Sequence, residues 1–167
     1  MINRIKLNEP IRIYFKYSNN SYSLFPLKVN DKFMLCASEY DFTFDGYTIR
    51  RLEDIEEIQT GAKYQEIVKN EKIFNDIEQI NVKIDTWKDV FSSLYNLNEN
   101  VIIECEDLDD NMFYIGKIEK VNDGDLEFKA FDNNAIWDKN VNSIKYENIT
   151  SVTFKSRYIN VFSKYAN

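Results

Sequence analysis

The sequence contains no histidine, the residue that most often serves enzymes as a general base. This absence also removes Ser-His and Cys-His nucleophile pairs and most zinc sites. The two cysteines are too few for a four-cysteine zinc site, and neither a P-loop nor a Rossmann glycine motif occurs. We therefore expect a protein that is not an enzyme and that needs no cofactor.

Glycine and proline are scarce, with four and two residues, which excludes a glycine-rich linker, a collagen-like tract or a proline-rich ligand segment. Any connector between domains must itself be structured. No hydrophobic run approaches the ~20 residues that cross a bilayer, and residues 1–10 lack the apolar core of a signal peptide. We expect a cytoplasmic protein without a membrane partner.

The two cysteines lie far apart in sequence, in apolar contexts that are typical of strands. Cys36 and Cys105 are therefore expected to be reduced and buried, as is usual in the cytosol, and a disulfide between them is the minority alternative.

Basic residues are fewer than acidic ones, so the net charge is −7 and the pI is about 4.8. Such a chain repels nucleic acid and anionic lipid at long range. The basic pair Arg50 and Arg51 is followed at once by four acidic residues within 53–57, which offset it. RNA as a partner is thus disfavoured.

Apolar and aromatic residues, in contrast, are plentiful: 44% of the chain is hydrophobic, with 12 Phe and 11 Tyr. Segment 11–17 is rich in β-branched and aromatic residues, and apolar stretches follow at 22–29, 32–38, 42–44, 49–52 and 55–60. Turn pairs at Asn30-Asp31 and Asp45-Gly46 separate them. The pattern predicts a β-meander of about five strands over residues 1–61.

The periodicity then changes to that of helices. Apolar residues at helical spacing predict one helix beginning near Ala62, and Asp85-Thr86 offers a cap for a second helix with an apolar face from Trp87 to Leu94. We expect a helical connector over residues 62–98.

Strand patterns resume over residues 99–167, with predicted strands at 101–106, 112–121, 126–131, 143–146 and 149–154. The pattern assigns no structure to 158–162. The halves also align: segment 52–55 falls opposite 146–149, Lys63-Tyr64 opposite Arg157-Tyr158, and, with one inserted residue, Phe44-Asp45 opposite Trp137-Asp138. Duplication and a merely shared strand pattern both explain this match.

The second half resembles an Sm-like or SH3-type small barrel, because a long second strand contains Phe113-Tyr-Ile-Gly116-Lys-Ile118. A glycine in the bent second strand of such barrels tolerates the sharp bend. The resemblance implies a mainly β, α+β fold of two five-stranded barrels. The Asp-x-x-Met-Asn and Arg-Gly signatures of Sm proteins are absent, so RNA binding is not implied.

One acidic segment supplies oxygen ligands at the spacing of a calcium loop: Glu104, Glu106, Asp107, Asp109, Asp110 and Asn111. The turn glycine and the closing glutamate are missing, where Met112 and Ile118 stand instead. An acidic hairpin turn is the better interpretation, and a metal-dependent hydrolase is the weaker one.

Aromatic residues on strands, such as Tyr14, Phe15, Tyr17, Phe128 and Phe131, suit either core packing or stacking on single-stranded nucleic acid. The acidic charge favours core packing.

A tryptophan in the polar loop 132–138 offers a partner anchor or a cap on the barrel end. We take Trp137, Asp138 and Tyr158 as the candidate partner surface, although the recurrence of Tyr64 and Tyr158 at matching places by itself indicates a shared structural contact rather than a site.

The leading hypothesis is a bacterial, non-enzymatic module that binds a protein partner. An Sm-like RNA-binding protein is the alternative, and it requires Lys117, Lys120, Lys129, Lys145, Lys155 and Arg157 to share one face. Alternation along the strand opposes this locally, because Lys145 and Glu147 fall on the same side. An exposed edge strand leaves a homodimer open.

Overall fold

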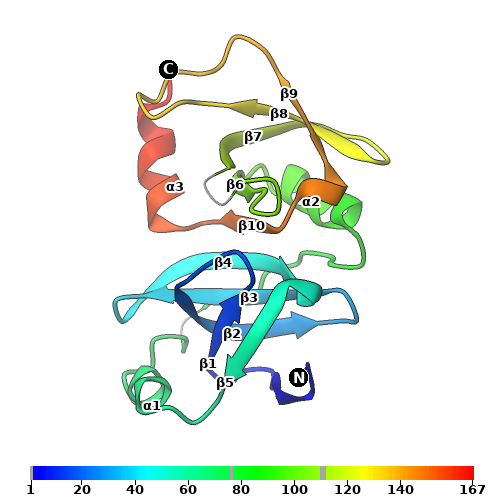
Figure 1. The fold of residues 1–167 in the computed structure, drawn as a ribbon. Helices are drawn as coiled ribbons and strands as arrows, with labels where there is room; N and C mark the ends of the chain where they lie inside the picture. Colours follow the sequence, from blue (N-terminus) through cyan, green and yellow to red (C-terminus); the bar gives the residue numbers. More distant parts are fainter. Residues whose placement is uncertain (1, 76, 110–111) are drawn as a thin grey trace. The chain divides into compact units, whose positions relative to one another are not determined.

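A computed structural model describes residues 2–75, 77–109 and 112–167 (Figure 1). Strands account for 41% of the chain and helices for 22%, so the protein is mostly β, as expected. The chain divides into two compact units, Met1–Ile80 and Asn81–Asn167. The division falls within the predicted connector, residues 62–98, so that one helix of this segment belongs to each unit. No helix among the described residues is long and apolar enough to cross a membrane.

The first unit is an open antiparallel sheet with the strand order β5-β1-β2-β3-β4. Its strands are β1 (Ile11–Phe15), β2 (Ser21–Val29), β3 (Phe33–Tyr40), β4 (Thr43–Arg51) and β5 (Ile55–Gln59). Short 3₁₀ helices lie at Ile2–Arg4 (η1) and Leu52–Asp54 (η2), and α1 spans Lys63–Asn70. The five predicted strands are confirmed, and α1 begins next to Ala62, as the periodicity indicated.

The second unit repeats this plan, with the strand order β10-β6-β7-β8-β9. Its strands are β6 (Asn100–Glu104), β7 (Phe113–Val121), β8 (Asp125–Ala130), β9 (Asn142–Lys145) and β10 (Ser151–Phe154). The helical elements are α2 (Trp87–Asn96), η3 (Tyr146–Asn148), α3 (Arg157–Phe162) and η4 (Ser163–Tyr165). The predicted closure into two small barrels is not confirmed, because the described strand pairings leave the sheet open.

Alternation along the first strand of each unit separates a buried face from an outer face. Ile11, Ile13 and Phe15 are buried in β1, whereas Arg12 and Tyr14 between them are half-buried. Val101 and Ile103 follow the same pattern in β6. One core cluster of the first unit is formed by the buried residues Ile11, Ile13, Phe15, Leu24, Met34, Cys36, Leu52, Ile55 and Ile58.

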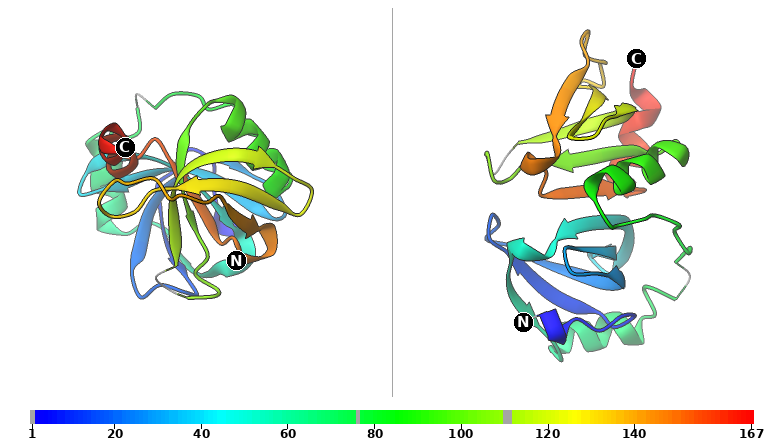
Figure 2. Two further views of the ribbon diagram at one scale, coloured as in Figure 1. Left: turned by 90° about the horizontal axis from the view of Figure 1, so that it is seen from above. Right: turned by 90° about the vertical axis from the view of Figure 1, so that its right-hand side faces the viewer.

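The helix predicted to begin at Trp87 is α2, and its start has the expected cap. The Thr86 hydroxyl accepts a hydrogen bond of 3.1 Å from the Asp89 backbone N–H, which satisfies one of the free donors of the first turn. The predicted apolar face, from Trp87 to Leu94, is buried. Figure 2 shows α2 beside the sheet of its own unit, where it packs against β7.

One turn prediction was wrong. The chain reverses at Asp41-Phe42, a two-residue hairpin loop between Tyr40 and Thr43, and not at Asp45-Gly46. Asp45 and Gly46 instead lie inside β4, at an irregularity of the pairing with β3, where Gly46 takes a φ of 75°. A glycine with positive φ serves a bulge as well as a hairpin turn, so the sequence pattern alone did not distinguish them.

Candidate functional site

The strand pairings give a residue-by-residue correspondence between the two units. Arg12 pairs with Ser23 in the first unit just as Ile102 pairs with Ile115 in the second. Between β3 and β4 of the first unit, Glu39 pairs with Phe44. The corresponding contact in the second unit is the bridge between Phe131 and Trp137. The second strand is bulged at the same place in both units, between Pro26 and Lys28 and between Ile118 and Lys120. The correspondence therefore covers every strand, although few residues are identical.

A helix follows the fifth strand in each unit and flanks a pocket at matching positions. The first-unit pocket is lined by Arg12, Ser21, Ser23, Glu39, Tyr40, Asp41 and Tyr64. The second-unit pocket is lined by Phe113, Tyr114, Ile115, Ala130, Phe131, Asp132, Asn133, Asp138, Tyr158 and Phe162. Six of the seven first-unit residues, all except Arg12, correspond to a residue that lines the second pocket. The same site is thus polar in one unit and aromatic in the other.

Aromatic rings in mutual contact form the wall of the second-unit pocket. Tyr158 stacks on Phe162 with ring centroids 5.4 Å apart, and Phe162 lies 5.7 Å from Phe131. Trp137 meets Phe131 edge-on at 5.0 Å. Tyr158 and Phe162 lie on consecutive turns of one face of α3, which places their rings side by side. Phe131 is buried, and the outer end of the row, at Tyr158, is exposed to solvent.

The three residues of the predicted partner surface lie in this part of the second unit. Asp138 and Tyr158 line the pocket, whereas Trp137 is half-buried in a small core cluster with Ile115, Phe131 and Ile159. The Trp137 backbone N–H donates to the Asn167 carbonyl oxygen at 3.1 Å. Trp137 therefore supports the pocket wall from behind, and Tyr158 presents its ring at the opening.

Acidic groups lie at the rim of the second-unit pocket. The Asp132 carboxylate accepts backbone hydrogen bonds from Ile136 at 3.0 Å and Asn134 at 2.8 Å, which lower its pKa. Asp138 is exposed, and its carboxylate accepts a hydrogen bond of 3.3 Å from the Asn142 amide. The rim is negatively charged at neutral pH, while the ammonium group of Lys117 lies over the Trp137 ring at 5.7 Å.

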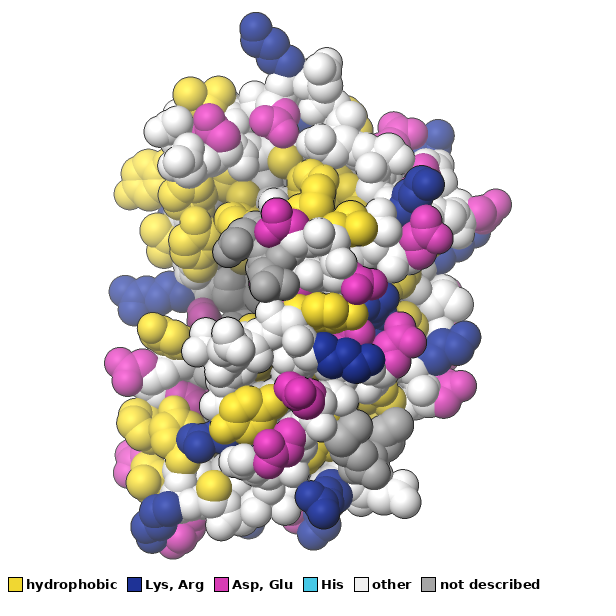
Figure 3. Space-filling view, viewed as in Figure 1, with side chains coloured by type: hydrophobic (Ala, Val, Ile, Leu, Met, Phe, Trp, Pro, Cys, Tyr) yellow, Lys and Arg dark blue, Asp and Glu magenta, His cyan; other side chains and the backbone are white. Residues whose placement is uncertain are grey.

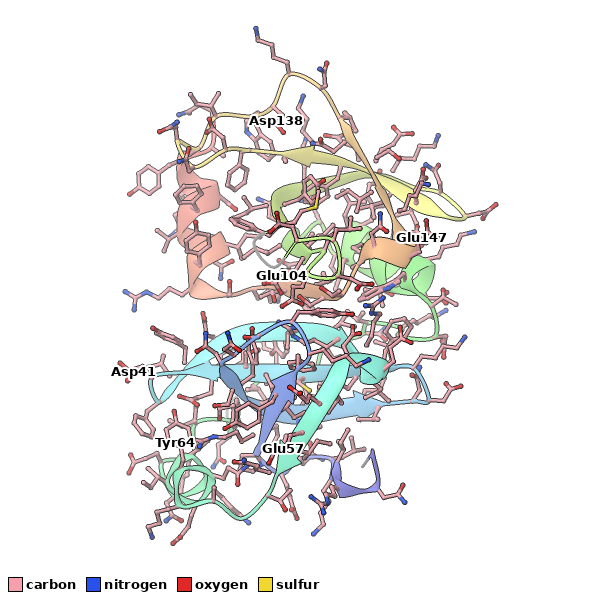
Figure 4. The ribbon with its side chains drawn as sticks, viewed as in Figure 1. Asp41, Glu57, Tyr64, Glu104, Asp138 and Glu147 are labelled. Atoms are coloured by element: carbon pink, nitrogen blue, oxygen red, sulfur yellow. The ribbon has the colours of Figure 1, made fainter. Side chains whose placement is uncertain are left out.

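The first-unit pocket is built around a buried carboxylate. Tyr64 donates its hydroxyl to both carboxylate oxygens of Glu39, at 2.9 and 3.0 Å, and the Phe42 backbone N–H donates to the same group. The Arg12 guanidinium lies 5.1 Å from the centre of the Tyr64 ring. Burial, with a further contribution from Glu39, raises the pKa of Tyr64 to about 12. Figure 4 shows Tyr64 on α1 and Asp41 at the β3–β4 turn.

Two glutamates of the predicted acidic segment form hydrogen bonds within the second unit. Glu106 is buried and accepts a hydrogen bond of 2.7 Å from the Thr150 hydroxyl, and Glu104 accepts one from Ser151. Asp110 and Asn111, which completed the calcium-like spacing, lie outside the described residues. Among the described residues, no group of three acidic or cysteine side chains is arranged to hold a metal ion.

The cysteine and core predictions can be checked directly. Cys36 and Cys105 are both buried and form no disulfide, as expected, and burial raises the pKa of the Cys36 thiol. Phe15, Phe128 and Phe131 are buried, so core packing is the correct interpretation for these three rings.

Several pocket residues were missed by sequence reasoning. Phe113 is 53% exposed and Phe162 lies beside Tyr158, but neither stands out among so many aromatic residues. Arg12 and Glu39 lie far apart in sequence on different strands. The alternation of Arg12 with apolar residues in the sequence is a signal for an outward side chain that was not used, and only the fold shows that Glu39 lines the same pocket.

Comparison of the chain with known protein families, characterised proteins and solved structures gives no significant match. The resemblance to Sm-like and SH3-type barrels therefore stays a prediction, and function must be argued from the two pockets.

Proposed function

We propose that the protein is a non-enzymatic binding module whose second-unit pocket receives an apolar side chain of a protein partner. The observation that carries the proposal is the exposed aromatic wall. Phe113 and Tyr158 are 53% and 54% exposed and flank a cavity of about 240 Å³. Figure 3 shows apolar side chains gathered over α3. Aromatic side chains that cluster around a pocket and are open to water are typical of the anchor sites of protein interfaces.

The charge of the rim narrows the chemistry of the partner. Asp132 and Asp138 line the same pocket as the aromatic rings, and hydrogen bonding keeps Asp132 ionised. Complementary charge across an interface favours a partner with a lysine or arginine next to its apolar anchor. The expected ligand is therefore a protein segment in which an aromatic or long aliphatic residue lies beside a basic one.

Each unit is, in this proposal, a small barrel-like repeat of the SH3 type that arose by duplication. Its support is the shared strand order, the 3₁₀ turn between the fourth and fifth strands (η2 and η3) and the matching bulge of the second strand. The absence of histidine, the most common general base, supports a non-enzymatic role. The two buried cysteines, which form no disulfide, support a cytoplasmic location.

RNA binding remains the second candidate function, and the ion pairs weaken it. Four of the six basic residues that would form its surface are paired with glutamates: Lys117 with Glu119, Lys120 with Glu127, Lys145 with Glu147, and Lys155 with Glu99. A lysine that is ion-paired with a glutamate attracts phosphate weakly. Affinity for nucleic acid grows with the number of basic side chains that contact the phosphate backbone of the nucleic acid.

Selection of peptides from a displayed random library tests the protein-binding proposal. The full chain is the bait, and counter-selection uses a variant with both Phe113→Ser and Tyr158→Ser. Tyr95→Ser serves as the matched control, because Tyr95 is an aromatic residue of the same unit, on α2, with a similar exposed fraction of 51%. We expect enriched peptides to carry an apolar anchor beside Lys or Arg, and to bind the control but not the double variant.

Two outcomes would contradict this proposal. Enriched peptides that bind the double variant as well as the parent would place the binding surface elsewhere. A bait that retains nuclease-sensitive RNA from a lysate, and selects no peptide, would favour the alternative function.

A further inference from the structure

The first unit carries a second pocket at the position that corresponds to the aromatic one, and it has a different chemistry. Its cavity of about 500 Å³ is lined by an arginine, two serines, two acidic residues and two tyrosines. We infer that this pocket binds a small organic carboxylate, with Arg12 as the principal contact. This inference is independent of the proposed protein-binding role of the second unit, because no residue is common to the two pockets.

Arg12 is the group best suited to hold an anion. It is half-buried on the outer face of β1, between two fully buried isoleucines, and its guanidinium lies over the Tyr64 ring. Among the described residues, no carboxylate lies within ion-pair distance of it. A guanidinium stacked on a ring keeps the N–H groups of its edge available, and their geometry matches the two oxygens of a carboxylate.

Ser23 supplies a second, independent observation. Its hydroxyl oxygen is buried and has no hydrogen-bond partner in the part of the chain that the structure describes. Ser23 lies directly opposite Arg12 in the β1–β2 pairing, and side chains in such pairs are neighbours on one face. A buried hydroxyl without a partner is destabilising, and rotation of the Ser23 side chain toward the pocket would let it donate to a bound carboxylate.

Negative charge in the same pocket selects against ligands of higher charge. Glu39 is buried, and its oxygens already accept hydrogen bonds from Tyr64 and from the Phe42 backbone. Asp41 adds a second carboxylate to the lining. These two groups repel a phosphate dianion more strongly than a carboxylate monoanion, so the pocket favours the monoanion.

The turn that borders the pocket is held in a sparsely populated conformation. Asp41 and Phe42 both have positive φ values, 50° and 59°, in a two-residue loop where glycine or asparagine is usual. Glu39 and Tyr64 hold it in place: Glu39 accepts the Phe42 N–H, and the Phe42 and Tyr64 rings lie 5.0 Å apart. Backbone strain of this kind concentrates at ligand sites, where it fixes the pocket before the ligand arrives.

Titration of the ¹⁵N-labelled full chain, followed by backbone amide NMR, tests the inference. The probes are sodium phenylacetate, its neutral counterpart phenylacetamide, and phenyl phosphate. We expect phenylacetate to shift the amide signals of Arg12, Ser23 and Tyr64 in a saturable manner. Phenylacetamide should leave them in place, and phenyl phosphate should bind more weakly than phenylacetate. Equal shifts with the amide, or none with phenylacetate, would overturn the inference.

Two variants and one control separate effects on binding from effects on folding. Arg12→Gln should weaken phenylacetate binding about tenfold or more, because hydrogen bonds to charged groups are the strong ones. Arg4→Gln, a change at an exposed arginine of η1, should leave binding intact. Ser23→Ala should weaken binding and at the same time raise the Tm, since it removes the unbonded hydroxyl. Unchanged affinity in both Arg12→Gln and Ser23→Ala would contradict the assignment.

Discussion

Gly116 lies where the backbones of β7 and β8 approach each other closely in the second unit. Its φ is 156°, and a Cβ built at this position would lie 2.0 Å from the Lys129 carbonyl oxygen and 2.9 Å from the Ala130 Cα. These atoms belong to the backbone of the neighbouring strand β8, so they cannot rotate away as a side chain could. Leu24 takes the corresponding place in the first unit, opposite Ile11 as Gly116 is opposite Val101.

We expect Gly116→Ala to lower the free energy of unfolding by about 2 kcal/mol or more, as overpacking against rigid neighbours does. Gly124→Ala is the matched control, because a Cβ there would meet nothing within 4 Å. It should change stability by only about 0.5 kcal/mol. Urea denaturation of the two variants checks this, and equal stability would show that β8 yields easily to the added methyl group.

Tyr64 provides a pH-dependent test of the first-unit pocket. Its pKa is raised from 10.0 to about 12, first by burial and then by the hydrogen bond to Glu39. The folded state therefore keeps a proton that the unfolded state loses as the pH passes 10. The contribution of Tyr64 to stability is complete below pH 10 and is lost as the pH rises through 12.

We expect the difference in unfolding free energy between the parent and Tyr64→Phe to shrink over this interval of pH. Tyr146, whose pKa burial also raises to about 12, is present in both proteins and cancels in the difference. Urea denaturation at a series of alkaline pH values provides the measurement. A difference that stays constant between pH 10 and 12 would mean that the Tyr64 phenol is not held by Glu39.

The helices that follow the fifth strands begin with the same backbone geometry. Ala62 precedes α1 with φ −68° and ψ 150°, and Ser156 precedes α3 with φ −70° and ψ 155°. Only Ser156 has a capping side chain, which accepts from the Ile159 N–H at 3.4 Å. In α1 the Gln65 side chain instead accepts from the Ala62 backbone N–H at 2.8 Å. One unit thus contains a cap that the other lacks.

This comparison predicts opposite effects at the two positions. Ser156→Ala should lower the free energy of unfolding by about 1 kcal/mol, the usual value of an N-terminal cap. Ala62→Ser should raise it by a smaller amount, because the serine finds the backbone already in capping geometry. Thermal denaturation of both variants checks the pair. A loss of stability in Ala62→Ser would show that the two helix starts are not equivalent.

The sequence indicated where the helices and strands lie better than it indicated which residues form the turns between them. Thr86 marked the start of α2, and the strand signals located all ten strands. The reversal at Asp41-Phe42 escaped prediction because Phe42 does not favour positive φ, and the turn is stabilised by Glu39 and Tyr64, which lie elsewhere in the sequence. The conformational preferences of single residues do not predict a turn whose stability depends on tertiary contacts.

The alignment of the first half of the sequence with the second half predicted which elements of the two units correspond. The matches of Lys63-Tyr64 with Arg157-Tyr158 and of 52–55 with 146–149 place residues in equivalent elements. The pockets themselves were not predictable, since their chemistry arises where separate strands and one helix meet. The recurrence of Tyr64 and Tyr158 indicated a shared structural contact. Arg12 and Glu39 have apolar counterparts, Ile102 and Phe131, and therefore gave no repeated signal.

The two units present one pocket twice with different ligand chemistry: a carboxylate contacted by Arg12 in the first unit, and an apolar group beside a cation in the second. Two probes with the same ring and opposite charges, phenylacetate and phenethylamine, test this difference on a single ¹⁵N-labelled sample of the full chain. We predict that phenylacetate shifts signals around Arg12 and Tyr64, and that phenethylamine shifts those around Phe113 and Tyr158, where Asp132 and Asp138 attract its ammonium group. Shifts by both probes at one pocket, or at neither, would contradict it.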